Sequence, residues 1–277
     1  MGRRFELTEF RNQVAASIEE KDELILLSSG IWSFGSKINL SLDILVESLF
    51  ESIISILRPH QTLLLPAFTY SFCKNRFYNP RITPPETGVV SLHAMNDKRG
   101  IRTKSAINSY FAFGSAASLL GETIGESVWG KGSIAEKLEE TDAKILSLGL
   151  PISLSTGFMH RIEELEQVPY RYYKNFEGTW EQDGTRQSWE ERMFVRSQIV
   201  PAELDWSKLE DILKSESLLF STAEPFIFQS TTARKIIKAG RKMLSSDPLA
   251  LVQNYAAVSE WIINSREFEI QDLNKAE

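Results

Sequence analysis

The amino-acid sequence predicts an α/β protein with a mixed sheet, to which a hairpin and a helical C-terminal part are added. Three apolar segments of strand length occur at 22–29, 61–72 and 143–150. Segments with apolar residues on one helix face lie between them, which is typical of strands joined by helical crossovers. The Asp183–Gly184 pair predicts the tight turn of the hairpin.

The first half of the chain has the order helix, strand, helix, strand. Segment 7–21 repeats apolar residues at every fourth position and is predicted as a helix. The strand at 22–29 leads through a glycine-bearing loop into an apolar helix at 38–57, and Pro66 stops the next strand at 61–72. We therefore expect a βαβ unit with a right-handed crossover.

The middle of the chain is predicted to be rich in loops. Residues 70–115 carry three prolines and a polar string, and a loop of this length in a compact domain is usually functional. A helix is expected around Ser133 to Glu140, followed by the strand at 143–150. Segment 152–169 is predicted as a turn and a short helix that ends before a proline.

The C-terminal part is predicted to begin with a β-hairpin over 177–198. A helix at 205–217 and a strand-like segment follow, and two helices close the chain. In the second of them, Asp247 is the expected N-cap and Pro248 the first helical residue. We expect a single domain over 1–277, with the hairpin and the C-terminal helices packed on it.

Composition and charge exclude several classes of protein. The net charge of -6, without a long basic block, does not suit a nucleic-acid-binding role. No apolar run approaches the length of a membrane span, and the N-terminus lacks a secretory pattern. With Cys73 as its single cysteine, the chain forms no internal disulfide, and a cytoplasmic protein is expected. No metal is expected, and a homodimer is left open.

The polar cluster around His160 is the first candidate for catalysis. Glu163 and Glu164 follow His160 by three and four residues, which places both carboxylates on its face of a helix. Thr156 lies one turn earlier, at the expected helix start. A carboxylate beside an imidazole raises its basicity, so His160 could take a proton from an amine or a hydroxyl. Spacing alone favours the alternative, in which these residues and Arg161 form pairs on a solvated helix face.

Other catalytic arrangements have weaker support. No serine lies in a GxSxG elbow and no Walker A string is present. Cys73 is a possible nucleophile, but its neighbours in sequence include nothing that would lower its pKa, so a structural thiol is favoured.

The order of several segments resembles the aminoglycoside 3-N-acetyltransferase family. The block TGFMHRIEELEQVPYRY is the most specific, and the likeness extends over about residues 20 to 255. The other blocks are ILLSSGIWSFG, LLLPAFTYSF, YNPRITPPETG, RTKSAINSYFAFG, GKGSIAEKL and AKILSLGL. The resemblance implies an α/β/α sandwich with a mixed central sheet, different from the GNAT acetyltransferases, and acetyl-CoA as the cosubstrate.

The resemblance also implies roles for individual residues. His160 matches the catalytic histidine of the family, and Glu163 matches the acidic residue that follows it. A block that lines the CoA pocket matches Arg102, Thr103, Ser109, Ala112 and Gly114. The loop after the first strand, with Ser28, Ser29 and Gly35, resembles the cofactor-contacting turn.

Two departures from the family pattern concern this site. Ser105 and Ala106 stand where the CoA block has His-Pro, and Thr103 stands in place of its first serine. The family's threonine falls on Gly157, and Thr156 is one position early, which turns a helical side chain by about 100°. We therefore expect Thr156 to be an oxyanion donor only if the turn before the helix differs from the turn in other members of the family.

The expected function is transfer of an acetyl group from acetyl-CoA to an amino group of a small-molecule amino sugar. Acidic and basic residues are mixed in the candidate region, which favours a nucleotide-linked or surface-polysaccharide sugar over a polycationic aminoglycoside. A non-catalytic relative that binds CoA or a sugar, and an O-acyltransferase with the same His-Glu pair, are the alternatives.

Overall fold

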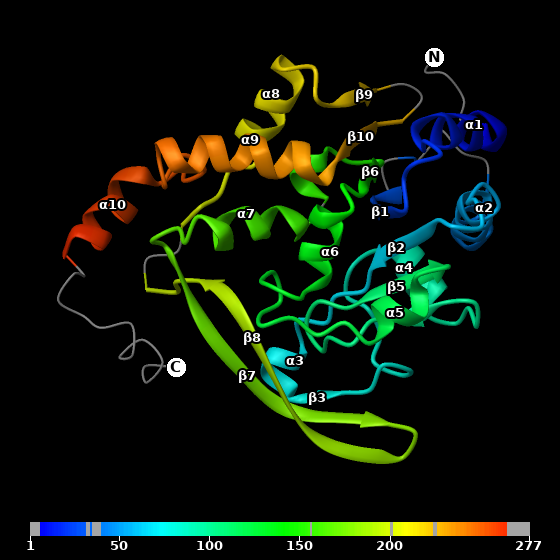
Figure 1. Cartoon of the computed structure of the whole chain (residues 1–277), viewed down its shortest axis with the longest axis horizontal. Helices are drawn as coiled ribbons and strands as arrows, with labels where there is room; N and C mark the ends of the chain where they lie inside the picture. Colours follow the sequence, from blue (N-terminus) through cyan, green and yellow to red (C-terminus); the bar gives the residue numbers. More distant parts are fainter. Residues whose placement is uncertain are drawn as a thin grey trace.

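The computed structural model describes residues 6–31, 34, 40–155, 157–199, 202–223 and 226–264. A seven-stranded sheet with the order β4-β5-β2-β1-β6-β10-β9 forms its centre (Figure 1). The strands of this sheet are β1 (Leu24–Ser29), β2 (Thr62–Pro66), β4 (Ile101–Arg102), β5 (Tyr110–Gly114), β6 (Lys144–Leu148), β9 (Phe220–Thr222) and β10 (Phe228–Thr232).

The sheet is mixed, as the sequence predicts. Strand β1 pairs in parallel with β2 and with β6. The outer strands β5, β4, β10 and β9 all pair in an antiparallel manner. The helix α2 (Leu42–Ile54) connects β1 to β2, which confirms the βαβ unit.

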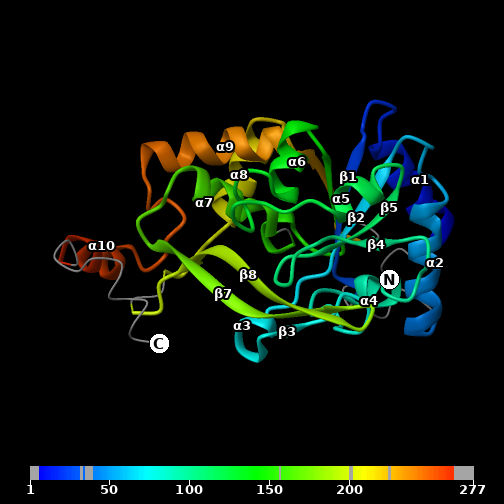
Figure 2. The same cartoon turned by 60° about the horizontal axis from the view of Figure 1, so that its bottom comes forward.

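Helices cover both faces of the sheet, and the side chains of β1 explain why. Ile25 and Leu27 belong to one hydrophobic cluster, with residues of α1 (Leu7–Ser17) and α2, whereas Leu24 and Leu26 belong to a second. Successive side chains of a strand point to opposite faces, so the apolar run 24–27 needs a layer on each side. The second cluster takes in residues of the helices α5 (Ala117–Gly121), α6 (Ile134–Glu140), α7 (His160–Leu165), α8 (Ser207–Ser215) and α9 (Ala233–Ser246). Figure 2 shows most of these helices together above the sheet. The expected α/β/α sandwich is confirmed.

The helices vary widely in length. Those that cover the sheet or close the chain are α1 (Leu7–Ser17), α4 (Val89–Ala94), α5 (Ala117–Gly121), α6 (Ile134–Glu140), α7 (His160–Leu165), α8 (Ser207–Ser215), α9 (Ala233–Ser246) and α10 (Tyr255–Asn264). The short helix α3 (Phe72–Asn75) and two 3₁₀ turns, η2 (Ile152–Leu154) and η3 (Gly157–Met159), complete the set. Within the described ranges, no helix is long and apolar enough to span a bilayer.

A long hairpin stands beside the main sheet. Its strands are β7 (Arg171–Gln182) and β8 (Thr185–Arg196), and β3 (Phe77–Tyr78) adds a third strand (Figure 2). Asp183 and Gly184 form the turn with φ of 53° and 78°, the left-handed conformation that a type I′ turn requires. The turn lies at the predicted residues, but the first strand begins six positions before the expected start at 177.

One expectation about elements is incomplete and another is wrong. Residues 70–115 are rich in loops, as predicted, but they also contain the short elements α3, β3, α4, β4 and β5, and β5 pairs with both β2 and β4 inside the sheet. Asp247 follows α9 and does not cap a new helix; its Oδ1 accepts the N–H of Leu249 at 2.9 Å. The chain after it folds inward to bury Leu249 and Leu251, and α10 begins only at Tyr255.

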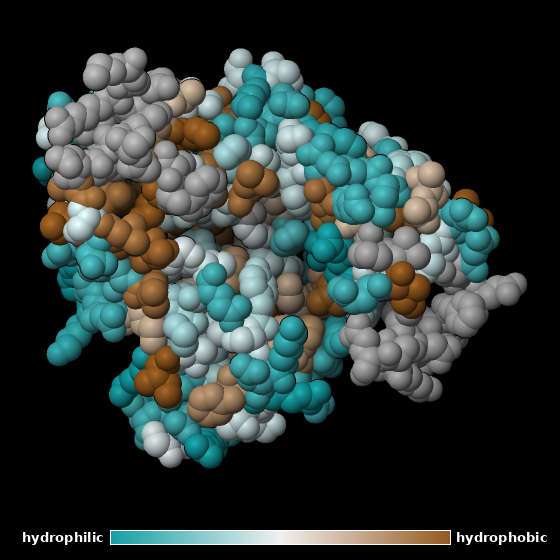
Figure 3. Space-filling view, turned by 180° about the vertical axis from the view of Figure 1, so that it is seen from behind, coloured by the Kyte–Doolittle hydropathy of each residue, from teal (hydrophilic) through white to brown (hydrophobic). Residues whose placement is uncertain are grey.

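Figure 3 shows the molecule from behind. This surface is largely polar, and one of its hydrophobic patches lies on the side of α2 and α4. Leu42, Ile44 and Leu92 are exposed large hydrophobic residues of these two helices.

Candidate active site

His160 lies at the start of α7, where a 3₁₀ turn runs directly into the helix. Its ring is flanked by Trp129 and Trp206, each with a ring centroid 5.7 Å away. Gly157 allows the rings of Phe68 and Trp129 to come close to the backbone, since a Cβ there would lie 2.9 Å from the ring of Phe68 and 3.1 Å from Trp129. The imidazole is held firmly, yet 29% of the side chain remains exposed.

A buried carboxylate and a buried guanidinium meet the inner nitrogen of His160. Nδ1 lies 2.5 Å from Oε2 of Glu163, and Nη2 of Arg171 lies 2.9 Å from the same oxygen and 3.0 Å from Nδ1. An ionised carboxylate only accepts, so its contact with Nδ1 requires a proton on Nδ1, and Nη2 of Arg171 donates to the shared oxygen rather than to Nδ1. The proton of neutral His160 is therefore assigned to Nδ1, and Nε2 carries the free lone pair.

Burial and the neighbouring charges set the protonation state of this pair. Burial lowers the pKa of His160, the Arg171 charge lowers it further, and the Glu163 charge opposes both. Burial by itself raises the pKa of Glu163, but the Arg171 and His160 charges outweigh it, so the pKa of this carboxyl is lowered. A neutral imidazole beside an ionised carboxylate is the state that a general base needs.

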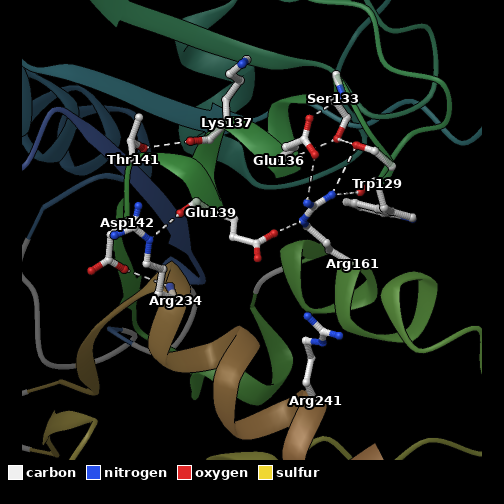
Figure 4. Close-up of polar contacts among 12 residues, drawn as sticks. Trp129, Ser133, Glu136, Lys137, Glu139, Thr141, Asp142, Arg161, Arg234 and Arg241 are labelled. Atoms are coloured by element: carbon white, nitrogen blue, oxygen red, sulfur yellow. Dashed lines mark hydrogen bonds and ion pairs between the residues drawn. The ribbon is translucent and has the colours of Figure 1, made fainter. Parts of the chain in front are cut away.

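Arg161 binds residues of α6 and holds the loop that carries Trp129. Its guanidinium donates to the carbonyl of Trp129 at 2.7 Å and contacts Glu139 at 2.5 Å and Glu136 at 3.4 Å (Figure 4). The side chain is 6% exposed. The alternative of ion pairs on a solvated helix face therefore does not hold, since Arg161, Glu163 and Glu164 are all buried.

Glu164 takes no part in the contact with His160, contrary to the expectation that both carboxylates share its face. Oε1 of Glu164 accepts the hydroxyl groups of Ser127 and, at 3.1 Å, of Tyr173. One further residue along a helix rotates the side chain by about 100°. Glu164 consequently anchors the 125–131 loop to β7, and Glu163 alone reaches the imidazole.

A cavity of about 930 Å³ lies between the hairpin and two loops, 103–108 and 123–128. Its lining mixes cations with carboxylates, namely Arg76, Lys104, Lys174 and Arg192 with Glu126, Glu177, Glu190 and Glu191. His160 does not line it. The two are connected through Ser127 and Tyr173, which line the cavity and bind Glu164, one turn along α7 from His160.

The residues expected to bind the cofactor separate into two groups. Thr103 lines the cavity, where its Oγ1 accepts the N–H of Tyr110 at 2.8 Å. Arg102, in contrast, donates to Ser109 and to loop carbonyls including that of Ala67. Arg102 and Ser109 are thus occupied by protein contacts.

Gly114 is needed for the backbone, with φ of 131° and a Cβ that would lie 2.1 Å from the carbonyl oxygen of Gln61. Ser28 and Ser29 end β1, away from the cavity lining, and Oγ of Ser28 is buried without a hydrogen-bond partner among the described residues. Gly35 and Thr156 lie outside the residues that the structure describes.

Sequence reasoning missed Trp129, Trp206 and Arg171, which contact His160 or its carboxylate. Arg171 lies within the VPYRY string, but nothing in its spacing shows that it reaches Glu163. Cys73 lines the cavity, and burial raises the pKa of its thiol to about 11, which makes it a poor nucleophile at neutral pH. The part of the chain that is described holds no group of three ligands suited to a metal ion.

Comparisons with known proteins place these features in context. The profile of the family described as "Aminoglycoside 3-N-acetyltransferase" matches residues 35–244. No curated protein matches the chain.

Several solved structures share the fold. The apoenzyme of aminoglycoside acetyltransferase AAC(3)-IVa is 19% identical, with 94% of this chain and 98% of that chain covered and a TM-score of 0.71. AAC-IIIb in its binary complex with CoASH is 17% identical, with 87% and 97% covered and a TM-score of 0.73. The YokD protein from Bacillus subtilis is 14% identical, with 88% and 100% covered and a TM-score of 0.67.

Proposed function

Since the chain belongs to the aminoglycoside 3-N-acetyltransferase family, we propose that it transfers the acetyl group of acetyl-CoA to an amino group of an aminoglycoside, with His160 as the base. The observation that carries the role of His160 is its contact with the buried Glu163 and Arg171. The sequence predicted an acetyl-CoA-dependent N-acetyltransferase. The family has this activity and uses this cosubstrate.

The acceptor is the part of the proposal that departs from the sequence-based expectation. The mixture of acidic and basic residues in the sequence favoured a nucleotide-linked or surface-polysaccharide sugar. The family and its solved members give no support to such substrates, and one of those structures, a histidine-to-alanine mutant of AAC(3)-IVa, is a complex with a gentamicin. An aminoglycoside therefore replaces them as the proposed acceptor, and the cavity carboxylates Glu126, Glu177 and Glu190 are groups to which its ammonium ions can bind.

In the proposed reaction, Nε2 of His160 removes a proton from the acceptor amine as its nitrogen attacks the thioester carbonyl. The carbon–sulfur bond then breaks, and the proton passes from Nε2 to the departing thiolate. Glu163 holds Nδ1–H and offsets the positive charge that forms on the ring. Arg171 keeps the carboxylate ionised and disfavours a proton on His160 between turnovers.

The developing oxyanion needs hydrogen-bond donors. Thr156 and backbone N–H groups before α7 remain the proposed donors. Trp129 offers a further one, since its Nε1 is buried and unpaired within the described part of the chain and its ring packs against His160.

The decisive experiment measures thiol release from acetyl-CoA with a panel of aminoglycosides, amino sugars and matched alcohols, with product mass as the second readout. We expect N-acetylated aminoglycoside with the wild-type protein and far slower formation of it with His160→Gln. Acetylation of the alcohols alone would show an O-acyltransferase. Tight CoA binding without release of thiol with any acceptor would show a non-catalytic relative.

A further inference from the structure

Asn108 combines two features in the wall of the mixed cavity. The residue lines the cavity and is 4% exposed. Its Oδ1 is buried and has no hydrogen-bond partner among the residues described. A buried carbonyl oxygen without a donor costs free energy, and a bound molecule that supplies the donor recovers it.

The turn that presents Asn108 is held by Glu191 of β8. One oxygen of Glu191 accepts the hydroxyl of Ser105, and the other accepts the N–H groups of Ala106 at 2.7 Å and Ile107 at 3.1 Å. Oγ of Ser105 in turn accepts the N–H of Asn108 at 2.7 Å. The backbone of Asn108 is therefore fixed to the hairpin through a single carboxylate.

This arrangement depends on residues particular to the chain. Ala106 donates an N–H that a proline, which lacks this group, would not provide, and Ser105 supplies both the hydroxyl that Glu191 binds and the acceptor for Asn108. Burial raises the pKa of Glu191, and its hydrogen bonds to the turn oppose the shift. Ala106 and Ile107 of the turn are 0% exposed, and the hydroxyl of Ser105 is bound to Glu191. Among residues 105–108, Asn108 is thus the one whose side chain brings an unpaired polar atom to the cavity wall.

We propose that Asn108 is a substrate-binding residue whose side-chain carbonyl accepts a hydrogen bond from an N–H or O–H group of a molecule in the cavity, and that Glu191 positions it. The inference rests on the proposed function in taking the cavity as a substrate site. Two sources offer the donor, namely the amide groups of acetyl-CoA and the amino or hydroxyl groups of the acceptor.

The test compares Asn108→Ala with Asn108→Asp, which keeps the acceptor oxygens. Calorimetry measures the Kd of CoA and, separately, of gentamicin, and steady-state assays measure the two KM values and kcat. We expect Asn108→Ala to raise one Kd and the corresponding KM by about tenfold, the loss that follows from one unpaired buried group, with kcat little changed. Asn108→Asp restores most of the affinity, and the ligand affected identifies the source of the donor.

Glu191→Ala provides a second variant that leaves Asn108 in place. It should raise the same Kd as Asn108→Ala, whereas Glu191→Gln, which retains an acceptor for the backbone N–H groups, should have the smaller effect. Asn96→Ala, at an exposed position outside the cavity, is the matched control, and thermal melting shows that each variant is folded.

Unchanged affinity for both ligands in folded Asn108→Ala protein would overturn the proposal and would show that the amide binds only water. A different result would refute the proposed function, namely a wild-type protein that releases no thiol with any amine. Such a protein could still bind CoA or gentamicin less tightly when Asn108 is replaced by alanine, so the two proposals fail independently.

Discussion

Replacing Arg171 tests the assignment of the catalytic base most directly. Arg171→Met keeps the approximate bulk of the side chain but removes its charge, and Arg171→Lys retains the charge on a different head group. The guanidinium is 6% exposed and Glu163 is 0% exposed, so solvent does little to screen the contact. The proton affinity of the His160–Glu163 pair should therefore respond strongly to the loss of this cation.

The size of the effect on stability follows from the geometry. Removing one partner of a buried ion pair costs about 3–5 kcal/mol, because an uncompensated charge remains. For a chain of this size, 1 kcal/mol shifts Tm by about 2–4 °C, so Arg171→Met should lower Tm by roughly 6–20 °C. Arg171→Lys should lower it less, since a charge still faces Glu163.

The pH dependence gives the more specific result. Burial and then Arg171 lower the pKa of His160, so the wild-type protein keeps the base neutral to a lower pH than an unperturbed histidine would. Activity should be lost as the pH falls through the pKa of the pair. In Arg171→Met the pair takes up its first proton more readily, whichever residue holds it, and the acid limb of kcat/KM moves to higher pH.

The assay is thiol release across a pH series, with the Tm measured at each pH. The control is Arg186→Ala on the same hairpin, whose guanidinium is 72% exposed, and it should leave both the limb and the activity unchanged. An acid limb that stays in place, or that moves to lower pH, in a folded Arg171→Met protein would refute the reasoning. The same shift in Arg171→Lys would show that position and not charge is responsible.

Three further changes are predicted. His160→Gln should lower kcat by about 10²–10⁴, the usual contribution of a general base, while calorimetry finds the Kd of CoA unchanged; full activity would remove His160 from the mechanism. Arg161→Met should lower stability by about 3–5 kcal/mol in denaturant unfolding, because it leaves Glu139 unpaired and releases the carbonyl of Trp129; a change below about 1 kcal/mol would contradict this role. Gly114→Ala should lower Tm, since its Cβ would collide with the carbonyl of Gln61 at a positive φ; an unchanged Tm would show that the turn adapts.

The strands and helices with a clear periodicity were predictable from the sequence. The apolar run 24–27 indicated the strand β1, and Asp183–Gly184 located the hairpin turn. The short strand β5 was not predictable, since it owes its place to pairing with β2 and β4 rather than to length. The Asp247–Pro248 pair has the composition of a helix start, but burial of Leu249 decides the path of the chain there.

The candidate site was predictable only as far as residues close in sequence interact. His160 and Glu163 are three residues apart on one helix, and the structure brings them together. Arg171 lies on β7 and binds the same carboxylate. This contact could not be predicted, because the separation of Arg171 and Glu163 in the sequence does not show that the strand passes beside the helix. Trp206, directly before α8, also contacts the ring and is far from it in sequence.

The burial of α7 on several sides explains why its polar residues form a site and not a solvated face. Gly240 of α9 permits the closest approach, since a Cβ there would lie 2.4 Å from Cδ1 of Ile162. With α9 on one side, Arg161 must find its partners on α6 and its loop, and Glu163 must face β7. A helix of six residues has no stability of its own, so the contacts that stabilise α7 are the ones that orient its base. Mutations in these contacts should therefore lower stability and activity together, whereas Asn108→Ala should change ligand affinity alone.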